Sequence, residues 1–451
     1  MNTSSLTDGL FSTEGMQSIF SDSNTIQRML DVEAALARAL AVEDVIPQSA
    51  VAAIVSSCRA DLMDLDALAK SVSSAGNVAI PLVKQLTAVV ASTDADAARY
   101  VHWGATSQDV IDSGRVLQLR DAIDLITTDL AELADTLASL AHQHRATIMV
   151  GRTWMQHAQP TTLGLKIAGW LDAIMRHQDR LQALRTRVCV LQLGGAAGTL
   201  ASLGESGLTV ATALAKDLSL ALPALPWHTH RDRMGEVATT FGLLTGTLGK
   251  IARDIALHAQ TEIAELAEPL VQGRGGSSTM PHKRNPVACS AVLACAMRVP
   301  ALVSTMLTAM VQEQERALGG WQAEWDTLPE IASLTSAALN QLREVSSGLS
   351  VDAARMRSNI DITQGLIMAE AISLALAQHV GRAVAHELIE EACHQAVESG
   401  RSLLEVLKSD PRMPEKFSSG HLEALFDPAH YLGEAPAFVE RVLAHHRNRK
   451  A

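Results

Sequence analysis

A glycine- and serine-rich segment, Gly273–Pro286, combines a flexible backbone with residues that could bind an acid and remove a proton from it. Its three glycines and two serines leave many backbone N–H groups free for a developing oxyanion, and Lys283 offers a cation for a carboxylate. The same dipoles could lower the pKa of a serine hydroxyl so that the alkoxide takes a proton. The segment has neither the spacing of a P-loop nor the elbow of a serine hydrolase. Asn285 as N-cap and Pro286 at the first position predict that a helix starts here.

A second polar segment, Gly151–Gly164, is predicted to be a loop that runs into a helix at Pro160. Thr153, Gln156 and His157 could donate to a bound acid or exchange protons with it. A lone histidine in such a loop is as often a structural hydrogen-bonding residue as a catalyst. The segment is therefore a candidate site whose role its own residues leave open.

A third segment, His102–Ser113, carries hydroxyls where a long helix is expected to begin. Thr106 or Ser107 is well placed as an N-cap, and Thr106 with Asp109 fits a capping box. Hydroxyls and free N–H groups at a helix N-terminus can also hold a substrate carboxylate. Taken alone, the segment favours a purely structural helix cap over a carboxylate-binding site.

The placement of acidic residues points to a small anionic ligand. The chain has 37 Lys+Arg and 49 Asp+Glu, a net charge of −12, which argues against a polybasic protein that binds nucleic acid or a membrane surface. Yet 269–312 and 136–171 contain no Asp or Glu, where about five and about four would be expected at the mean frequency. Both stretches carry Arg, Lys and His. Buried helices also lack charge, but burial does not explain basic loops, so these stretches favour an anion site.

The elements that must position these residues are helical. Three apolar series follow the 4-3 spacing of a helix seam: Leu119, Ile123, Ile126, Leu130, Leu133, Leu137 and Leu140; Val237, Phe241, Leu244, Leu248, Ile251 and Ile255; and, less regularly, Ile167, Leu171, Ile174, Leu181, Leu184 and Val188. A helix over about 112–145 would be a rod of roughly 50 Å. Such rods usually pack against several others, often from neighbouring subunits. Strand signals are almost absent, so we predict an all-α protein.

Composition supports that prediction and excludes several classes. Aromatic residues are 3% and apolar residues 47%, which favours a helical core of small aliphatic residues. Five cysteines without a CxxC pair or a Cys/His cluster indicate neither a disulfide framework nor a zinc site. The first 27 residues lack Lys and Arg, unlike a signal peptide, and no apolar run approaches the length of a membrane span. We therefore expect a soluble, cytoplasmic protein.

Breaks in the helical pattern divide the chain into three expected units. Residues 1–111 form an N-terminal helical cap, residues 112–364 a central bundle of long helices, and residues 365–451 a C-terminal helical cap.

Together and in this order, the three polar segments resemble the signature segments of the fumarase/aspartase superfamily, and the helical layout extends the resemblance over most of the chain. Residues 276–286 match the Gly-Ser-Ser-x-x-Met-Pro-x-Lys-x-Asn-Pro loop in its shorter form. The resemblance implies a homotetramer with a central twenty-helix bundle, active sites shared between subunits, and no metal or cofactor. It implies that Ser277 is the general base, with Ser278 beside it. Lys283 and Asn285 would bind substrate carboxylates, and Thr106 and Ser107 would hold another.

One departure separates this chain from many members of the superfamily. Lyases that release an alcohol or an amine have His directly after Gly-Arg-Thr, where this chain has Trp154. Loss of that His makes chemical sense if the leaving group is a carboxylate, because a group with a pKa near 4 leaves without being protonated. Such an enzyme would be a cycloisomerase, adding a carboxylate of a tricarboxylate substrate across an activated double bond through an aci-carboxylate intermediate. The segments 75–81 and 315–325 are similar to those of lactonising members.

Two alternatives remain. Adenylosuccinate lyases share the Met-Pro-His-Lys-Arg-Asn-Pro wording but carry Arg-His-Asp-Val where this chain has residues 75–81, and Trp154 also weakens that alternative. A catalytically silent structural protein on the same fold is the other. If Ser277 does not move the proton, His102 or His157 could do so.

Overall fold

A computed structural model describes residues 6–270, 275–276, 280, 283–417 and 419–449. Its contacts group the chain into two compact units. Unit 1 comprises residues 1–131, 177–249 and 291–341, and unit 2 comprises 132–176, 250–290 and 342–451. The described residues are predominantly helical, which confirms the all-α prediction.

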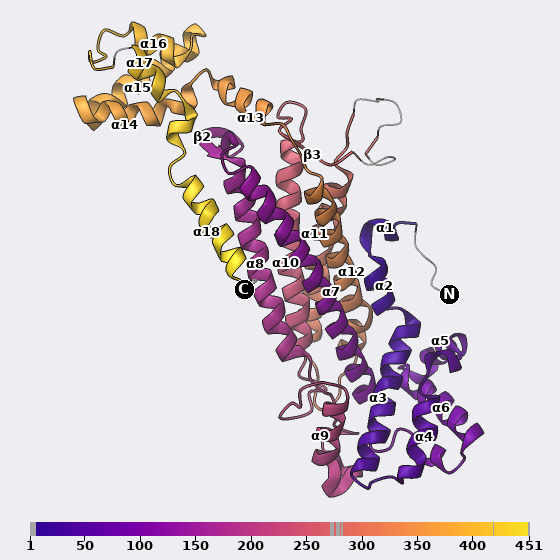
Figure 1. Cartoon of the computed structure of the whole chain (residues 1–451). Coiled ribbons are helices and arrows are strands. Elements are labelled where there is room, and N and C mark those ends of the chain that lie inside the picture. The colour runs from indigo at the N-terminus through magenta and orange to yellow at the C-terminus, as the bar shows by residue number, and fades with distance from the viewer. Residues whose placement is uncertain (1–5, 271–274, 277–279, 281–282, 418, 450–451) are drawn as a thin grey trace. The chain divides into compact units, whose positions relative to one another are not determined.

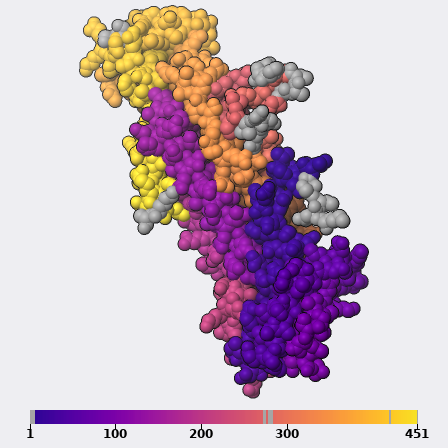
Figure 2. Space-filling model, turned by 45° about the vertical axis from the view of Figure 1, so that its right-hand side comes forward, coloured from indigo at the N-terminus to yellow at the C-terminus, as the bar shows by residue number. Residues whose placement is uncertain are grey.

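Unit 1 begins with short helices that pack on one another. They are α1 (Asp8–Phe11), α2 (Glu14–Ile19), α3 (Asp22–Val42), α4 (Gln48–Ser57), α5 (Leu65–Ala75), α6 (Ala79–Thr93) and, later in the chain, α9 (Gly207–Asp217). The 3₁₀ helices η1 (Ala60–Leu62), η2 (Ala97–Tyr100) and η3 (Ala201–Ser206) join them. Side chains start several of these helices: the Ser21 hydroxyl accepts from the Asn24 N–H, and Asp64 accepts from that of Ala67. In Figure 2 residues 6–100, indigo to violet, form one continuous body.

Five long helices lie side by side among the described residues of unit 1 (Figure 1), and each also contributes residues to unit 2. They are α7 (Ser107–Gln143), α8 (Leu163–Val188), α10 (Asp232–His258), α11 (Val287–Ala309) and α12 (Gly320–Ser347). All three predicted seams face the interior. Every seam residue is buried except Leu140, which is half-buried. Removing these aliphatic side chains from water is the main favourable term in forming the bundle.

Unit 2 contains the other elements. They are β1 (Ile148–Thr153), β2 (Gln156–Thr162), β3 (Leu266–Ala267), β4 (Ser350–Val351), α13 (Ala353–Ile360), η4 (Asp361–Thr363), η5 (Leu366–Met368), α14 (Ala369–Val380), α15 (Arg382–Ser399), α16 (Leu403–Ser409), α17 (Ser419–Leu425), η6 (Pro428–Tyr431) and α18 (Ala435–Asn448). The C-terminal helices share an apolar core that includes Ile372, Leu376, Leu403 and Leu407. The ring of His446 on α18 lies 2.9 Å from Asp135 of α7.

The predicted polar loop at residues 151–164 is wrong in detail, because it forms an antiparallel hairpin of β1 and β2 and the helix starts at Leu163, not Pro160. The two turn residues, Trp154 and Met155, have φ angles of 51° and 64°. This left-handed pair is usually built from Asn-Gly or a similar sequence. Bulky residues occupy both positions here, so the usual sequence signal for a hairpin is missing.

Helix α11 corrects the expectation that no apolar run approaches the length of a membrane span. An 18-residue window of it has a mean hydropathy of 1.8, so by length and composition α11 could cross a bilayer. The bent pair 353–363 and 366–380 passes the same test when taken together. One-third of the α11 window is buried inside the chain. The exposed side of α11 therefore presents apolar surface.

The three-unit division at residues 111 and 364 stays a prediction. The two compact units are each assembled from three stretches of sequence.

Candidate active site

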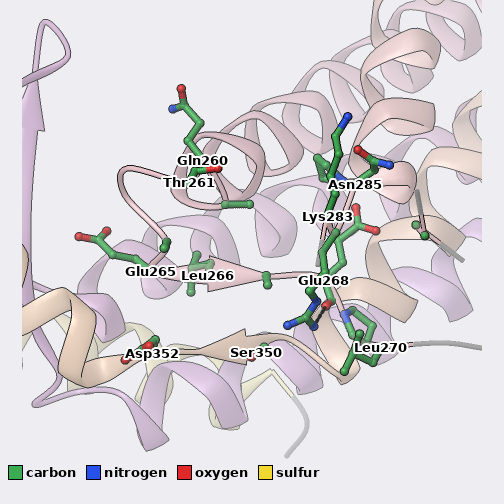
Figure 3. A pocket seen from close by; sticks show the side chains of 18 of the residues that line it. Gln260, Thr261, Glu265, Leu266, Glu268, Leu270, Lys283, Asn285, Ser350 and Asp352 are labelled. Atoms are coloured by element: carbon green, nitrogen blue, oxygen red, sulfur yellow. Dashed lines mark hydrogen bonds between the residues drawn. The ribbon is translucent and has the colours of Figure 1, made fainter. Parts of the chain in front are cut away.

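Unit 2 contains a cavity of about 830 Å³ that is lined by the end of the glycine- and serine-rich segment (Figure 3). Lys283, Arg284 and Asn285 lie on its wall together with β3, with Ser350 of β4 and with Asp352, which follows β4. Lys283 is exposed, and its ammonium group has no partner among the described residues. The same holds for the side-chain amide of Asn285 within the described part of the chain. These two groups are available to an incoming anion.

The acidic residues of the cavity wall are already engaged. Glu268 accepts hydrogen bonds from the backbone N–H groups of Ala288 and Cys289, at 3.1 and 2.7 Å, and so caps α11. Asp352 accepts from the Arg355 N–H at 2.8 Å. Helix α11 begins at Val287, so the predicted start at Asn285 and Pro286 is wrong. The reason is that Glu268, from before the loop, supplies the cap and leaves the Asn285 amide free.

The loop that carries Lys283 is closed at its base by backbone hydrogen bonding. The Asn285 N–H donates to the Gly275 carbonyl at 2.9 Å, and Gly276 pairs with Arg284 as an isolated antiparallel bridge. Gly275 has a φ angle of 73°, and a Cβ atom there would lie 2.8 Å from the Asn285 carbonyl oxygen. The closed base therefore requires glycine at this position.

We expect Gly275→Ala to lower kcat/KM by about 10- to 100-fold, because it forces the base open and displaces Lys283 and Asn285. The left-handed backbone should also cost about 1–2 kcal/mol of folding free energy. Gly276→Ala is the matched control, since no atom lies within 4 Å of the added Cβ and its φ angle is not positive. Steady-state kinetics and thermal unfolding of both variants check the expectation. Equal activity of the two variants would contradict it.

Beside the cavity, the buried carboxylate of Glu265 ties the hairpin to β3. Arg152 on β1 donates to both of its oxygens at 2.8 and 2.9 Å, and His258 and Asn359 approach to 2.7 and 2.8 Å. Burial, the largest single influence, raises the pKa of Glu265, but the hydrogen bonds from His258, Arg152 and Asn359 outweigh it and lower the pKa to about 2. The carboxylate thus stays ionised and holds Arg152, which immediately precedes the predicted site residue Thr153.

The tip of the hairpin projects into solvent. Thr153, Trp154 and Gln156 are exposed, Trp154 to 98%, and none of them lines the cavity. His157 is half-buried opposite Arg152 in the strand register. Burial first, and then the charge of Arg152, lower the pKa of His157, although Glu265 opposes the shift. A neutral imidazole at pH 7 could accept a proton, and its Nδ1 atom is buried without a hydrogen-bond partner among the described residues.

In unit 1, the predicted helix start is organised by Asp109, which is buried. Its carboxylate accepts the Thr106 N–H at 3.0 Å, as a capping box requires. It also accepts the N–H groups of Gly194 and Gly195 at 2.9 Å, and lies 2.7 Å from Nε2 of His228. Helix α7 then begins at Ser107. Contacts from distant parts of the chain thus fix Asp109, which in turn positions Thr106 directly before the first residue of the helix, Ser107.

The structure places the predicted site residues in three groups. Lys283 and Asn285 share the cavity; Thr153, Trp154, Gln156 and His157 lie on the hairpin; His102, Thr106 and Ser107 lie in unit 1. Ser277 and Ser278 lie outside the described residues. Sequence reasoning missed the roles of Glu265 and Glu268. Their sequence signal is that they stand directly before the acid-free stretch that begins at Pro269.

Comparison with known proteins gives consistent likenesses. Residues 11–301 match the family model described as lyase, and residues 365–442 match that of the adenylosuccinate lyase C-terminus. The chain is 55% identical to 3-carboxy-cis,cis-muconate cycloisomerase of Pseudomonas aeruginosa, over 98% of this chain and 96% of that protein. It is 48% identical to the protein of that name from Acinetobacter baylyi, over 98% of each chain. The crystal structure of 3-carboxy-cis,cis-muconate lactonizing enzyme from Pseudomonas putida superposes with a TM-score of 0.95 at 53% identity, covering 99% of this chain and 100% of that one.

Proposed function

The chain belongs to the fumarase/aspartase superfamily, and on that premise we propose that it is a 3-carboxy-cis,cis-muconate cycloisomerase. It interconverts 3-carboxy-cis,cis-muconate and 4-carboxymuconolactone, a step of the protocatechuate branch of the β-ketoadipate pathway. The observation that carries the proposal is the likeness to cycloisomerases over nearly the whole chain. Trp154 supplies a chemical reason for it, because the hairpin has no acid at the position from which other lyases protonate a leaving group.

The proposed reaction needs an anion-binding wall and a proton donor. In the lactonising direction a carboxylate oxygen of the substrate forms the new C–O bond, and the electron pair of the double bond moves into the neighbouring carboxylate. Lys283, Asn285 and backbone N–H groups of the loop stabilise the resulting aci-carboxylate. A proton then reaches the adjacent carbon from Ser277 or from a water that Ser277 orients. In the reverse direction the same group removes that proton, and the carboxylate leaves without protonation.

Assay of the purified protein with 3-carboxy-cis,cis-muconate tests the proposal. We expect loss of the ultraviolet absorbance of the diene and formation of a lactone. Adenylosuccinate is the comparison substrate, and release of fumarate from it would favour the lyase alternative. No turnover of either compound would leave the silent structural protein as the better description.

We also propose that the cytoplasmic enzyme is a homotetramer whose active sites are shared between subunits. Support comes from α11, where six exposed and uncharged residues follow a 3-4 spacing, while the exposed Arg298 beside them pairs with Glu330 of α12. The six residues are Met297, Pro300, Ala301, Ser304, Leu307 and Thr308. We call these residues the α11 stripe. An apolar stripe on a long helix is suited to packing against another helix. The exposed hairpin tip, with Trp154 and Met155, is likewise suited to a neighbouring subunit.

Met297→Glu is expected to break the tetramer into smaller species, because it places a negative charge at one end of the α11 stripe. Met297 is 69% exposed in the single chain, so the fold of the subunit should tolerate the change. Light scattering after size-exclusion chromatography measures the mass. Val397→Glu, at a 68% exposed valine on α15 outside the stripe, is the control and should keep the wild-type mass. If Met297→Glu also keeps it, the stripe is not an interface.

A further inference from the structure

His102 has a strained backbone and is bound to a buried carboxylate. Its φ angle is 58°, a left-handed conformation that costs a non-glycine residue about 1–2 kcal/mol. Its Nδ1 atom lies 2.5 Å from Oε1 of Glu33 on α3, in the same unit. Strained residues of this kind persist where the surroundings impose them, and they cluster at functional sites.

The two partners differ in exposure. The side chain of Glu33 is 1% exposed and that of His102 is 18% exposed. Among the described residues, His102 is the one hydrogen-bonding partner of the Glu33 carboxylate, and Nε2 of His102 has none. A carboxylate on Nδ1 fixes the orientation of the ring, and Nε2 is then a donor whenever the ring is protonated.

The charges around the ring favour the protonated form. Burial, the largest single influence, lowers the pKa of His102. The charge and hydrogen bond of Glu33, from α3, and the charge of Asp109, from α7, outweigh it and raise the pKa above the ordinary value of 6.5. These charges therefore favour the ring form that carries two N–H groups.

The segment between His102 and α7 is held in one conformation. Gly104 has a φ angle of 79°, and its carbonyl accepts a hydrogen bond from the Ser202 hydroxyl at 3.3 Å. A Cβ atom at Gly104 would lie 2.3 Å from the Leu203 side chain, so this conformation requires glycine. His102 therefore keeps a fixed place four residues before Thr106.

We propose that Glu33 is a positioning residue that fixes the ring of His102 so that Nε2 donates a hydrogen bond to a carboxylate of the substrate. This inference rests on the proposed function, in which Thr106 and Ser107 hold a substrate carboxylate. Glu33 itself touches no substrate. Glu33 acts on the reaction through His102, by strengthening the binding of the substrate carboxylate.

Glu33→Gln tests the proposal, because it keeps the size of the side chain and removes its charge. We expect the pKa of His102, measured by NMR of ¹³C-labelled histidine and assigned by its absence in His102→Gln, to fall by about one unit or more. KM for 3-carboxymuconate at pH 7 should rise about tenfold while kcat changes less than threefold. Glu33→Asp should restore part of both effects. Asp135→Asn, which removes the carboxylate beside His446, is the control and should leave the His102 pKa and KM unchanged.

Each result decides the proposal. An unchanged His102 pKa in Glu33→Gln overturns it, and so does a fall in kcat at constant KM. If that variant does not fold, a wild-type His102 pKa below 6.5 overturns it. If the wild type does not turn over 3-carboxymuconate, the proposed function fails separately. Calorimetry with tricarballylate, a stable tricarboxylate, then measures whether Glu33→Gln weakens carboxylate binding, and equal affinity overturns the inference.

Discussion

Arg231→Ala is expected to destabilise the protein by about 3–5 kcal/mol at pH 7, the usual cost of breaking a buried ion pair. The Arg231 guanidinium on α10 donates to Asp112 at 2.7 and 3.1 Å and to Glu324 at 2.5 and 2.9 Å. All three side chains are nearly buried, 6% exposed at most. The variant removes the cation that pairs with both carboxylates and leaves Arg115 as the nearby positive charge, while Asp112 still receives the indole N–H of Trp321 at 3.0 Å. Denaturant unfolding measures the loss.

The loss of folding stability in Arg231→Ala should be smaller at acidic pH. Burial already raises the pKa of Glu324 in the intact protein, although Arg231 opposes the shift. Without Arg231 the folded-state pKa rises further, so the variant gains stability as pH falls through that range and loses it as pH rises. Arg233→Ala is the matched control. Like Arg231, Arg233 lies over the Trp227 ring, but it is half-buried and forms no ion pair among the described residues, so its replacement should cost only about 1 kcal/mol. If Arg231→Ala lowers the free energy of unfolding at pH 4.5 as much as it does at pH 7, this explanation is wrong.

Lys283→Ala is expected to lower kcat/KM for 3-carboxymuconate by about 10³-fold with little change in stability. The ammonium group is exposed, unpaired among the described residues, and placed on the cavity wall where the aci-carboxylate would gain its negative charge. The neighbouring carboxylates of Glu265 and Glu268 accept hydrogen bonds from other groups, so they leave the ammonium group of Lys283 to the substrate. Steady-state kinetics measure the fall, and thermal unfolding shows whether the fold is intact.

Lys250→Ala is the control for that experiment. Lys250 is another exposed lysine of unit 2, paired with Asp254, and it does not line the cavity. Its replacement should leave kcat/KM within twofold of the wild type. If Lys283→Ala keeps more than a tenth of the wild-type activity, Lys283 does not bind the charge that develops in the reaction.

The helices could be predicted from the sequence because their signal is periodic and local. The seam through Val237 and Ile255 is buried as its spacing indicates. The hairpin could not be predicted from the sequence, because its turn consists of Trp154 and Met155, whereas such turns are usually formed by Asn and Gly. The pairing of β1 with β2, not the propensity of the turn residues, sets that strained turn.

Some residues of the candidate site could likewise be predicted from the sequence, and others could not. Lys283 and Asn285 could be singled out because a linker has no use for them, and the structure places both on one cavity. The carboxylates that organise the site could not be predicted from the sequence. Glu265 binds residues 113 positions before it and 94 positions after it, and Glu33 binds a histidine 69 positions away. No local pattern records such partners.

The discontinuous units constrain how this protein can be built and altered. Unit 1 uses residues up to 341, and unit 2 uses residues from 132 to 451. Neither can be completed by a ribosome before about three-quarters of the chain has been synthesised, which postpones folding compared with a protein of successive domains. Five long helices belong to both units, so neither unit can be excised, exchanged or circularly permuted as a module without cutting a helix.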